Sequence, residues 1–241
     1  GCNAKTEAAA DHDSRSNESG YDEFCNQTEE LNERKEIMAT KEQVEFYDNF
    51  IDHFEEQQNN GRNTDFRNWA KKWVHEPKKI LDVGCSLGYN SAFFAQIGCE
   101  VHGIDISPKC IMAAKNKYPK CTWHCGDVTE GFDPGVRDFD VVIMSDVIEH
   151  VPLGKHKKLF EVLGQWTTPA AFVLGSVPNP ELHEEIQTQT YQPVEEKVNI
   201  PELLINMRAG GFRMLTSIFL LQGIYYRMIV QKVQKMEIRD E

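Results

Sequence analysis

A short glycine-containing segment, Asp82-Val83-Gly84-Cys85-Ser86-Leu87-Gly88, follows a run of apolar residues and leads into a stretch with helical spacing. Glycines at such a turn let the backbone bend sharply and approach a ligand closely, beside the N-terminus of the next helix. Asp105 lies 23 residues beyond Asp82, after the next apolar run. An acidic side chain at that position can accept both hydroxyls of a ribose. The pattern therefore indicates a nucleoside site.

Two other interpretations of this turn are weaker. A dinucleotide fold requires Gly-x-Gly-x-x-Gly, and Ser86 and Tyr89 break that fingerprint. A hydrolase elbow reads Gly-x-Ser-x-Gly, which residues 84–88 match literally. However, only helices are expected before this strand, and the sequence contains no His-Gly-Gly segment for an oxyanion loop. A nucleoside site without a pyrophosphate agrees best with the turn.

The elements that must position these residues alternate along the chain. Strands are expected at 79–84, 99–106, 121–128, 139–145 and 170–177, with helices at 89–97, 108–118 and 152–166. This alternation implies right-handed crossovers and a parallel sheet covered on both faces. After a helix at 201–209, the runs 212–221 and 224–233 are joined by Gln222-Gly223, which can connect only antiparallel neighbours. We expect a doubly wound α/β fold whose seven-stranded, mostly parallel sheet ends in an antiparallel hairpin.

Three regions are expected. Residues 1–40 hold ten acidic and four basic side chains and few large apolar ones, which is typical of a disordered leader. Residues 41–75 show apolar residues at helical spacing and are expected to form a helical cap, with one helix from Lys41 to about residue 59 and a second from Asp65 to Val74. Residues 76–241 form the α/β domain, in which the polar segment at about 178–200 is expected to be a lid.

Composition narrows the possible functions. The 241 residues carry a net charge of −12, which disfavours a general nucleic-acid binder because such proteins need basic surfaces. No apolar run approaches the ~18 residues of a membrane-spanning helix. Seven scattered cysteines are typical of a reduced, cytoplasmic protein, although a targeting segment could precede Gly1. The sequence does not indicate an oligomeric state.

Four ordered motifs carry a family resemblance: residues 80–88, 103–107, 126–128 and 139–151. Together they resemble the successive motifs of class I S-adenosylmethionine-dependent methyltransferases, which have a Rossmann-like fold. The resemblance covers about residues 76–233. Within the family, the chain resembles the small-molecule enzymes, such as ubiquinone-pathway and sugar O-methyltransferases. It implies S-adenosylmethionine as cofactor, S-adenosylhomocysteine as product and a small-molecule acceptor.

The resemblance also assigns cofactor-binding positions, all at the carboxyl ends of predicted parallel strands, where such sheets bind ligands. The amino-acid part of the cofactor would be bordered by Asp82, Gly84, Cys85 and Gly88. The ribose would be held by Asp105, and the methionine portion would face Ser145. The adenine would lie against Ile106, with Asp127 and Val128 at its edge.

Two histidines are candidate catalytic residues. Methyl transfer is an in-line displacement, and a base is needed only when the acceptor is protonated at neutral pH. His150 follows the fourth strand and His183 follows the fifth. A structural role also stays open for each: His150 fixing its loop, and His183 exposed on the lid segment.

Asp146, Glu149 and His150 fall at i, i+3 and i+4, so one helical turn would bring them to one face. Such a set could bind a divalent cation. Small-RNA 2′-O-methyltransferases and some ubiquinone-pathway enzymes have Glu-x-x-Glu-His here, but metal-free relatives also carry Glu-His. We therefore expect no metal, and methyl transfer to an oxygen or nitrogen of a small polar metabolite or sugar. The alternatives are a metal-assisted O-methyltransferase acting on a catechol or an RNA end, and a non-catalytic cofactor-binding regulatory domain.

Overall fold

The computed structural model describes residues 41–57, 61–182, 192–220 and 225–233. The chain divides into two units, Gly1–Lys41 and Glu42–Glu241, and the second contains all the strands described below. The predicted leader, the turn Gln222-Gly223 and His183 lie outside the described residues. Within the described ranges, no helix combines the length and apolar character needed to cross a membrane.

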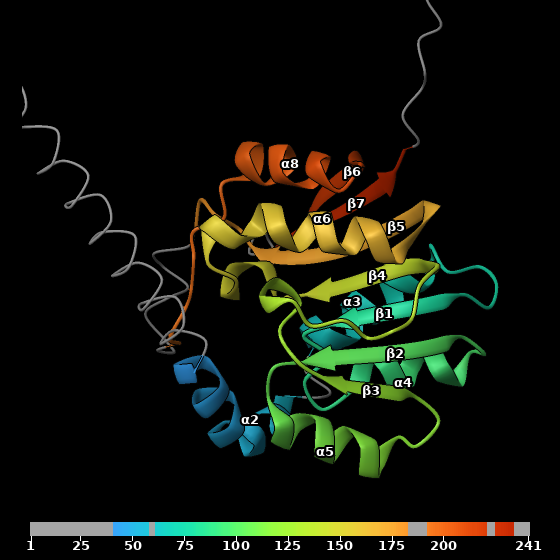
Figure 1. The fold of residues 1–241 in the computed structure, drawn as a ribbon, viewed down its shortest axis with the longest axis vertical. Helices are drawn as coiled ribbons and strands as arrows, with labels where there is room; N and C mark the ends of the chain where they lie inside the picture. The colour runs from blue at the N-terminus through green and yellow to red at the C-terminus, as the bar shows by residue number, and fades with distance from the viewer. Residues whose placement is uncertain (1–40, 58–60, 183–191, 221–224, 234–241) are drawn as a thin grey trace, which may run out of the picture. The chain divides into compact units, whose positions relative to one another are not determined.

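The centre of the second unit is a seven-stranded sheet in the order β3-β2-β1-β4-β5-β7-β6 (Figure 1). The first five strands of the chain pair in parallel, whereas β7 pairs antiparallel with both β5 and β6. This arrangement confirms the predicted doubly wound fold with its terminal antiparallel hairpin. The strands are β1 (Lys79–Val83), β2 (Glu100–Asp105), β3 (Thr122–Cys125), β4 (Phe139–Ser145), β5 (Thr167–Pro178), β6 (Phe212–Leu220) and β7 (Tyr225–Lys232).

Helices connect the strands and begin at recognisable caps. Ser107 accepts a hydrogen bond from the backbone N–H of Cys110 and precedes Pro108, the first residue of its helix. Asn199 caps a later helix by accepting from the N–H of Glu202. These α-helices are α4 (Tyr89–Gln96), α5 (Pro108–Lys117), α6 (His156–Trp166) and α8 (Ile200–Ala209). The 3₁₀ turns are η1 (Val128–Glu130), η2 (Ile148–His150) and η3 (Leu153–Lys155).

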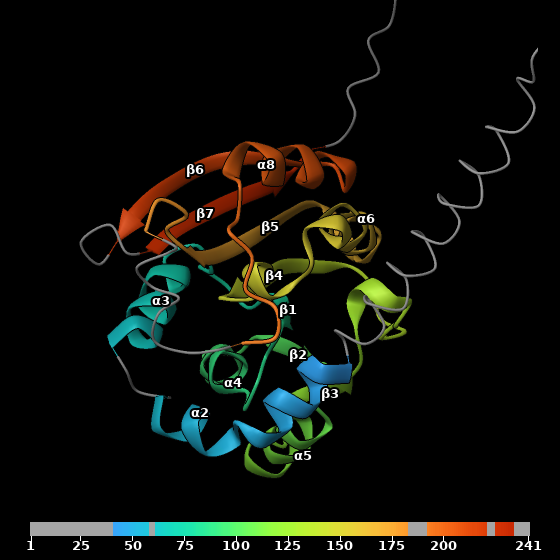
Figure 2. The ribbon, with the colours of Figure 1, turned by 90° about the vertical axis from the view of Figure 1, so that its left-hand side faces the viewer.

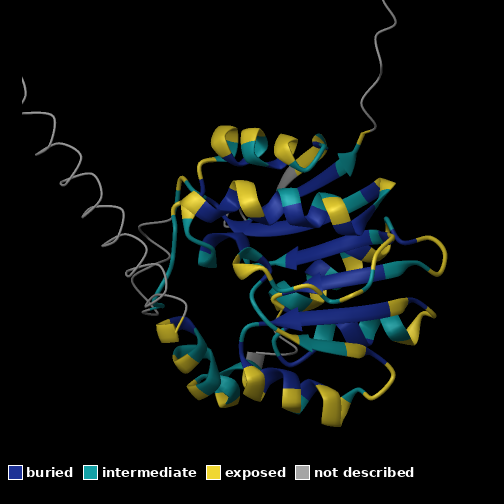
Figure 3. Ribbon diagram, in the orientation of Figure 1, coloured by how far each residue is buried: buried dark blue, intermediate teal, exposed yellow. Residues whose placement is uncertain are grey.

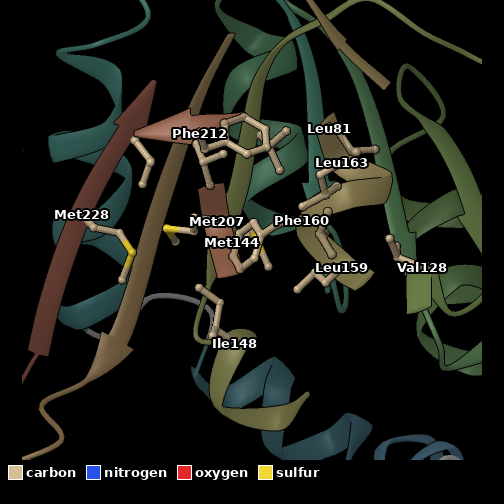
Figure 4. Packing of buried hydrophobic residues seen from close by; sticks show 14 of the residues in the cluster. Leu81, Val128, Met144, Ile148, Leu159, Phe160, Leu163, Met207, Phe212 and Met228 are labelled. Carbon is tan, nitrogen blue, oxygen red and sulfur yellow. The ribbon is translucent and has the colours of Figure 1, made fainter. Parts of the chain in front are cut away.

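Each face of the sheet has its own core. On one face, α6 and α8 pack side chains such as Phe160 and Met207 against Met144 and Met228 (Figure 4). On the other face, Phe66 and Phe94 pack against alternate residues of β1, β4, β5 and β7. The central strands are accordingly buried on both sides, as Figure 3 shows. Burying each large apolar side chain contributes about 1.5–3 kcal/mol, so this core fixes the strand ends to which the site residues belong.

The helical cap differs in detail from the prediction. The sequence pattern predicts a single helix from Lys41 to about residue 59, but residues 41–49 are helical, Phe50 interrupts the helix, and α2 (Ile51–Gln57) follows. The next helix, α3 (Gly61–Lys71), begins four residues before the expected Asp65. The extra turn contains Arg62, which contacts residues from elsewhere in the chain, so tertiary interactions override the local pattern there.

Part of the cap lies at one edge of the sheet. Figure 2 looks onto the edge where the parallel strands end, and residues 42–49, α2 and the described segment 192–199 lie at this edge, whereas α3 packs on the face of the sheet that also carries α4. The candidate site is at this edge.

Candidate active site

The glycine turn leaves β1 and enters α4 through left-handed backbone conformations. Gly84 has φ +65° and is exposed, and Gly88 has φ +78°. Ser86 also has a positive φ, +48°, which is uncommon for a residue with a side chain. A Cβ atom on Gly88 would lie 2.2 Å from the Trp123 ring, so Gly88 is needed for packing as well as for the turn.

Asp105 joins this turn to the end of β2. Its Oδ2 accepts the N–H of Ser86 at 2.8 Å, and its Oδ1 accepts the N–H of Ser107 at 2.9 Å. Burial raises the pKa of Asp105, and these backbone hydrogen bonds oppose that effect. Because each carboxylate oxygen can accept a second hydrogen bond, the side chain is both fixed in place and able to receive two hydroxyls.

Asp82 lies behind the turn. Its carboxylate is buried and accepts a hydrogen bond from the hydroxyl of Ser91 at 2.6 Å, which ties β1 to α4. Burial raises the pKa of Asp82 to about 7. Cys85, the turn's thiol, is buried as well. That these two residues border a cofactor stays a prediction.

The predicted adenine side is built by the segment after β3. The strand ends at Cys125 and not at the expected Val128, because Asp127 caps η1 by accepting both the N–H and the hydroxyl of Thr129 at 2.7 Å. Val128 packs into the core, and Ile106 is half-buried beside Asp105. The assignments of Ile106, Asp127 and Val128 to the adenine stay predictions.

Two polar atoms near the turn have no partner among the described residues: Ser86 Oγ and Asn90 Oδ1, both buried. A buried polar atom without a hydrogen bond costs about 1–3 kcal/mol, so such atoms commonly mark the place of a ligand. In the sequence, Ser86 stands out as a break in a dinucleotide fingerprint and as the serine of a hydrolase-like elbow, and Asn90 does not stand out at all. Polar side chains within the turn and the first turn of α4 are the signal that could have found both.

The cap reaches the same edge through Tyr47 and Asp48. Asp48 Oδ1 accepts the hydroxyl of Ser107 at 2.5 Å, and Ser107 is also the residue whose N–H holds Asp105. Tyr47 donates to Gln192 at 3.1 Å, and burial together with the charges of Asp105 and Glu149 raises its pKa. Tyr47 therefore lies near both Asp105, at the end of β2, and Glu149, in η2. The aromatic spacing of this helix suggests core packing, so the sequence does not reveal this role.

The second half of the site follows β4. Ser145 ends the strand, and Asp146 adopts a left-handed backbone, φ +55°, held by a hydrogen bond from its N–H to the carbonyl of Ser176 at 2.9 Å. The Nε of Arg62 lies 3.3 Å from Asp146 Oδ2. Arg62 also donates through Nη1 to the hydroxyl of Tyr225, at 2.6 Å, so three distant segments meet here.

Glu149 and His150 occupy η2. Glu149 is buried, and its burial, with the charge of Asp146, raises its pKa well above the usual value. Nδ1 of His150 lies 3.0 Å from the carbonyl oxygen of Val194, which can only accept, so Nδ1 carries the proton and Nε2 keeps a lone pair. Burial lowers the pKa of His150, which favours this neutral form. Gln43 fixes the loop by donating to the His150 carbonyl at 2.6 Å.

The arrangement of Asp146, Glu149 and His150 does not fit a divalent cation. Arg62 already supplies a positive charge to Asp146, where a cation would be repelled. The parts of the chain that the structure describes contain no group of three His, Cys, Asp or Glu side chains that could hold a metal ion. His183, the second candidate catalytic residue, lies outside them.

The chain is similar in sequence and fold to known methyltransferases. Residues 80–170 match the model of a family described as methyltransferase domain. The chain is 30% identical over 97 residues to a magnesium-protoporphyrin O-methyltransferase of Rhodobacter capsulatus, a match covering 38% of this chain and 42% of the relative. It is 33% identical over 79 residues to a ubiquinone biosynthesis O-methyltransferase of Aromatoleum aromaticum, covering 31% and 34%. The matched region thus spans less than half of either relative.

The fold is shared over a longer stretch. A TehB-like SAM-dependent methyltransferase from Corynebacterium glutamicum superposes with a TM-score of 0.63 at 15% identity, covering 78% of this chain and 98% of that one. At this level of identity the likeness concerns the fold. It extends beyond residues 80–170 and so includes elements outside the matched family model.

Proposed function

We propose that the chain is a class I S-adenosylmethionine-dependent methyltransferase and transfers the methyl group of S-adenosylmethionine to an oxygen or nitrogen of a small polar metabolite or sugar. The match of residues 80–170 to a methyltransferase domain and the similarity to O-methyltransferases support this proposal. The observation that carries this proposal is Asp105, whose carboxylate is held by backbone N–H groups of the glycine turn and of the loop after β2. The unpartnered Ser86 Oγ and Asn90 Oδ1 beside it add polar groups suited to a ligand.

The bound cofactor would supply a methyl group attached to a positively charged sulfur. The chain's task is then to hold the nucleoside, align the acceptor and exclude water. Asp105 would accept the ribose hydroxyls, Ser86 and Asn90 would meet the amino-acid part, and Ser145 would face the methionine portion. Tyr47 and Asp48 would close the site from the cap, consistent with the bond between Asp48 and Ser107.

His150 is the proposed base. Its Nε2 carries the lone pair. The residue is held in place by the bond of Nδ1 to the Val194 carbonyl and by the bond of Gln43 to the His150 carbonyl. With a hydroxyl as acceptor, Nε2 would take the proton that the hydroxyl releases as it receives the methyl group supplied by the bound cofactor. The two curated relatives are named as O-methyltransferases, which favours oxygen over nitrogen.

The five described cysteines are free, in keeping with a cytoplasmic enzyme.

The test is transfer of labelled methyl groups. The full chain is incubated with S-adenosylmethionine carrying a ³H-methyl group and with a fractionated mixture of polar metabolites. We expect label in an acceptor fraction, no label with Asp105→Ala, and no change on adding a chelator. Absence of transfer with every fraction, although S-adenosylhomocysteine binds, would contradict the enzymatic proposal and favour a cofactor-binding regulatory domain. Loss of activity with chelator, restored by a divalent cation, would favour the metal-assisted alternative.

A further inference from the structure

Arg62, Asp146 and Glu149 share a feature that their salt bridge does not explain. Each keeps a buried polar atom without a hydrogen-bond partner among the described residues: Nε of Arg62, Oδ1 of Asp146 and Oε2 of Glu149. The Nε of Arg62 lies near Asp146 Oδ2, at 3.3 Å, but its N–H does not make a hydrogen bond. One donor and two acceptors therefore stay open within one cluster.

The chain holds this cluster in a strained arrangement. Asp146 keeps its left-handed backbone although it is not a glycine, and its N–H bond to Ser176 maintains that conformation. Arg62 is fixed from the opposite side by the hydroxyl of Tyr225, and its guanidinium lies 5.2 Å from the centre of that ring. Strain that the surroundings maintain is most common where a ligand binds.

The charges of the cluster balance. Arg62 and Asp146 form one pair of opposite charges. Burial and the charge of Asp146 raise the pKa values of Glu149 and Glu195, which favours the neutral forms of both side chains. Arg227 and Asp65, which belongs to the same helix as Arg62, form a second pair 3.1 Å apart. A charged ligand would therefore gain no net attraction, because Asp146 would repel an anion that Arg62 attracts, and Arg62 would repel a cation that Asp146 attracts.

We propose that Arg62, Asp146 and Glu149 form the acceptor subsite of the methyltransferase, and that it takes an uncharged hydroxyl group rather than a carboxylate or an amine. A hydroxyl both accepts and donates, so it can receive the N–H of Arg62 Nε and donate to Asp146 Oδ1. Glu149 Oε2 can accept from a neighbouring hydroxyl of the same molecule. His150, next to Glu149, is then placed to take the proton of the reacting group. This inference rests on the proposed function, because it assigns the acceptor of that reaction.

The charge balance provides the test. Two sets of matched small molecules differ mainly in charge: glucose, gluconate and glucosamine, and benzyl alcohol, benzoate and benzylamine. Each is titrated by calorimetry into the full chain saturated with S-adenosylhomocysteine. We expect the uncharged member of at least one set to bind about tenfold or more tighter than its charged partners, which corresponds to about 1.4 kcal/mol.

Two variants should then change which charged member of each set gains affinity. Asp146→Asn removes the negative charge and suits the left-handed backbone, which asparagine tolerates, so the anionic member should gain affinity. Arg62→Gln removes the positive charge, so the cationic member should gain. Melting curves check that both variants are folded, and both should bind S-adenosylhomocysteine as the unmodified chain does.

The proposal is overturned if the unmodified chain prefers a charged member, if it binds no uncharged member, or if Asp146→Asn leaves the charge preference unchanged. Failure of S-adenosylhomocysteine to bind the unmodified chain identifies the proposed function as the error, and the subsite falls with it. Cofactor binding without the expected charge preference identifies the subsite alone as the error.

Discussion

The two halves of the site are built in different ways. On the cofactor side, Asp105 is held by N–H groups of Ser86 and Ser107, which belong to adjacent loops at the ends of neighbouring parallel strands. On the acceptor side, Asp146 is approached by Arg62, which in turn contacts Tyr225 in the last strand. Backbone groups satisfy the first half, whereas side chains from distant segments assemble the second.

This difference determines how each half responds to change. A carboxylate fixed by backbone donors depends on the loops that supply them, so its geometry is robust to distant substitutions. A cluster of side chains with open hydrogen-bonding atoms depends on each partner separately. On this account, the proposed cofactor side is held rigidly, and we expect substitutions on the proposed acceptor side to change specificity.

The largest expected effect separates catalysis from cofactor binding. His150→Gln removes the lone pair proposed to receive the proton, and we expect kcat to fall by about 10²–10⁴-fold. S-adenosylhomocysteine should bind as tightly as before, because the substitution is on the acceptor side. Steady-state rates and calorimetry on the same preparation measure both quantities.

The pH profile gives an independent check of the same residue. Burial lowers the pKa of His150 from its usual value of 6.5, so the side chain is the neutral base at pH 7 and becomes protonated only in acid. The rate of the unmodified chain should therefore be constant near neutrality and decline only as the pH falls below that value. A decline that begins above pH 7 would contradict the assignment.

A smaller effect concerns the interior of the cofactor side. Asp82 has a native pKa of about 7 against a reference value of 3.8, so the native state binds the extra proton between these values. The contribution of Asp82 to the free energy of unfolding should consequently decrease by about 2–3 kcal/mol as pH rises from about 5 to 8, and Asp82→Asn should make the measured slope shallower by that amount. Urea unfolding at several pH values measures it.

Asp133→Asn is the matched control for that measurement. Asp133 is exposed, and its bond to Arg137 lowers its pKa to about 2. Its contribution to stability is therefore present above pH 3.8 and lost only below it, so the same substitution should leave the slope between pH 5 and 8 intact. Equal slopes for the unmodified chain and Asp82→Asn would refute the burial account.

The smallest expected effect tests how tightly the turn is packed. Gly88→Ala introduces a Cβ atom 2.2 Å from the Trp123 ring, whereas Gly131, with a similar φ of +80°, has no atom within 4 Å of that position. The two alanine variants share the cost of a left-handed backbone, so their difference isolates the packing. We expect Gly88→Ala to be less stable by about 1–2 kcal/mol. Thermal melting compares the pair, and equal melting temperatures would show that Trp123 moves freely.

The comparison between the halves also explains which parts of the site are predictable from sequence. The cofactor side depends on contiguous motifs and on strand order, so the spacing points to Gly84, Gly88 and Asp105, and the predicted parallel sheet with its hairpin is confirmed. Arg62 carries no such signal, because its role depends on contacts with Asp146 and Tyr225, which lie 84 and 163 positions further along the chain. The local pattern even places the start of α3 at Asp65, three residues after Arg62.

His150 lies between these cases. Its position after the fourth strand follows from the motif, but its protonated nitrogen is set by Val194, a backbone carbonyl 44 residues away. Asp127 shows the opposite limit: its motif suggests a strand continuing to Val128, and a local cap through Thr129 ends the strand earlier. Short-range side-chain bonds and long-range pairs are the two features that spacing does not supply.

The most direct test of the account is calorimetric binding of S-adenosylhomocysteine to the unmodified chain, Asp105→Ala and Asp146→Asn. We expect one molecule to bind the unmodified chain, affinity to fall about 100-fold or more with Asp105→Ala, about 2.7 kcal/mol, and affinity to stay within about threefold with Asp146→Asn. Melting curves confirm that each variant is folded. Absence of binding to the unmodified chain, or equal losses in the two variants, would contradict the division of the site into a cofactor side and an acceptor side.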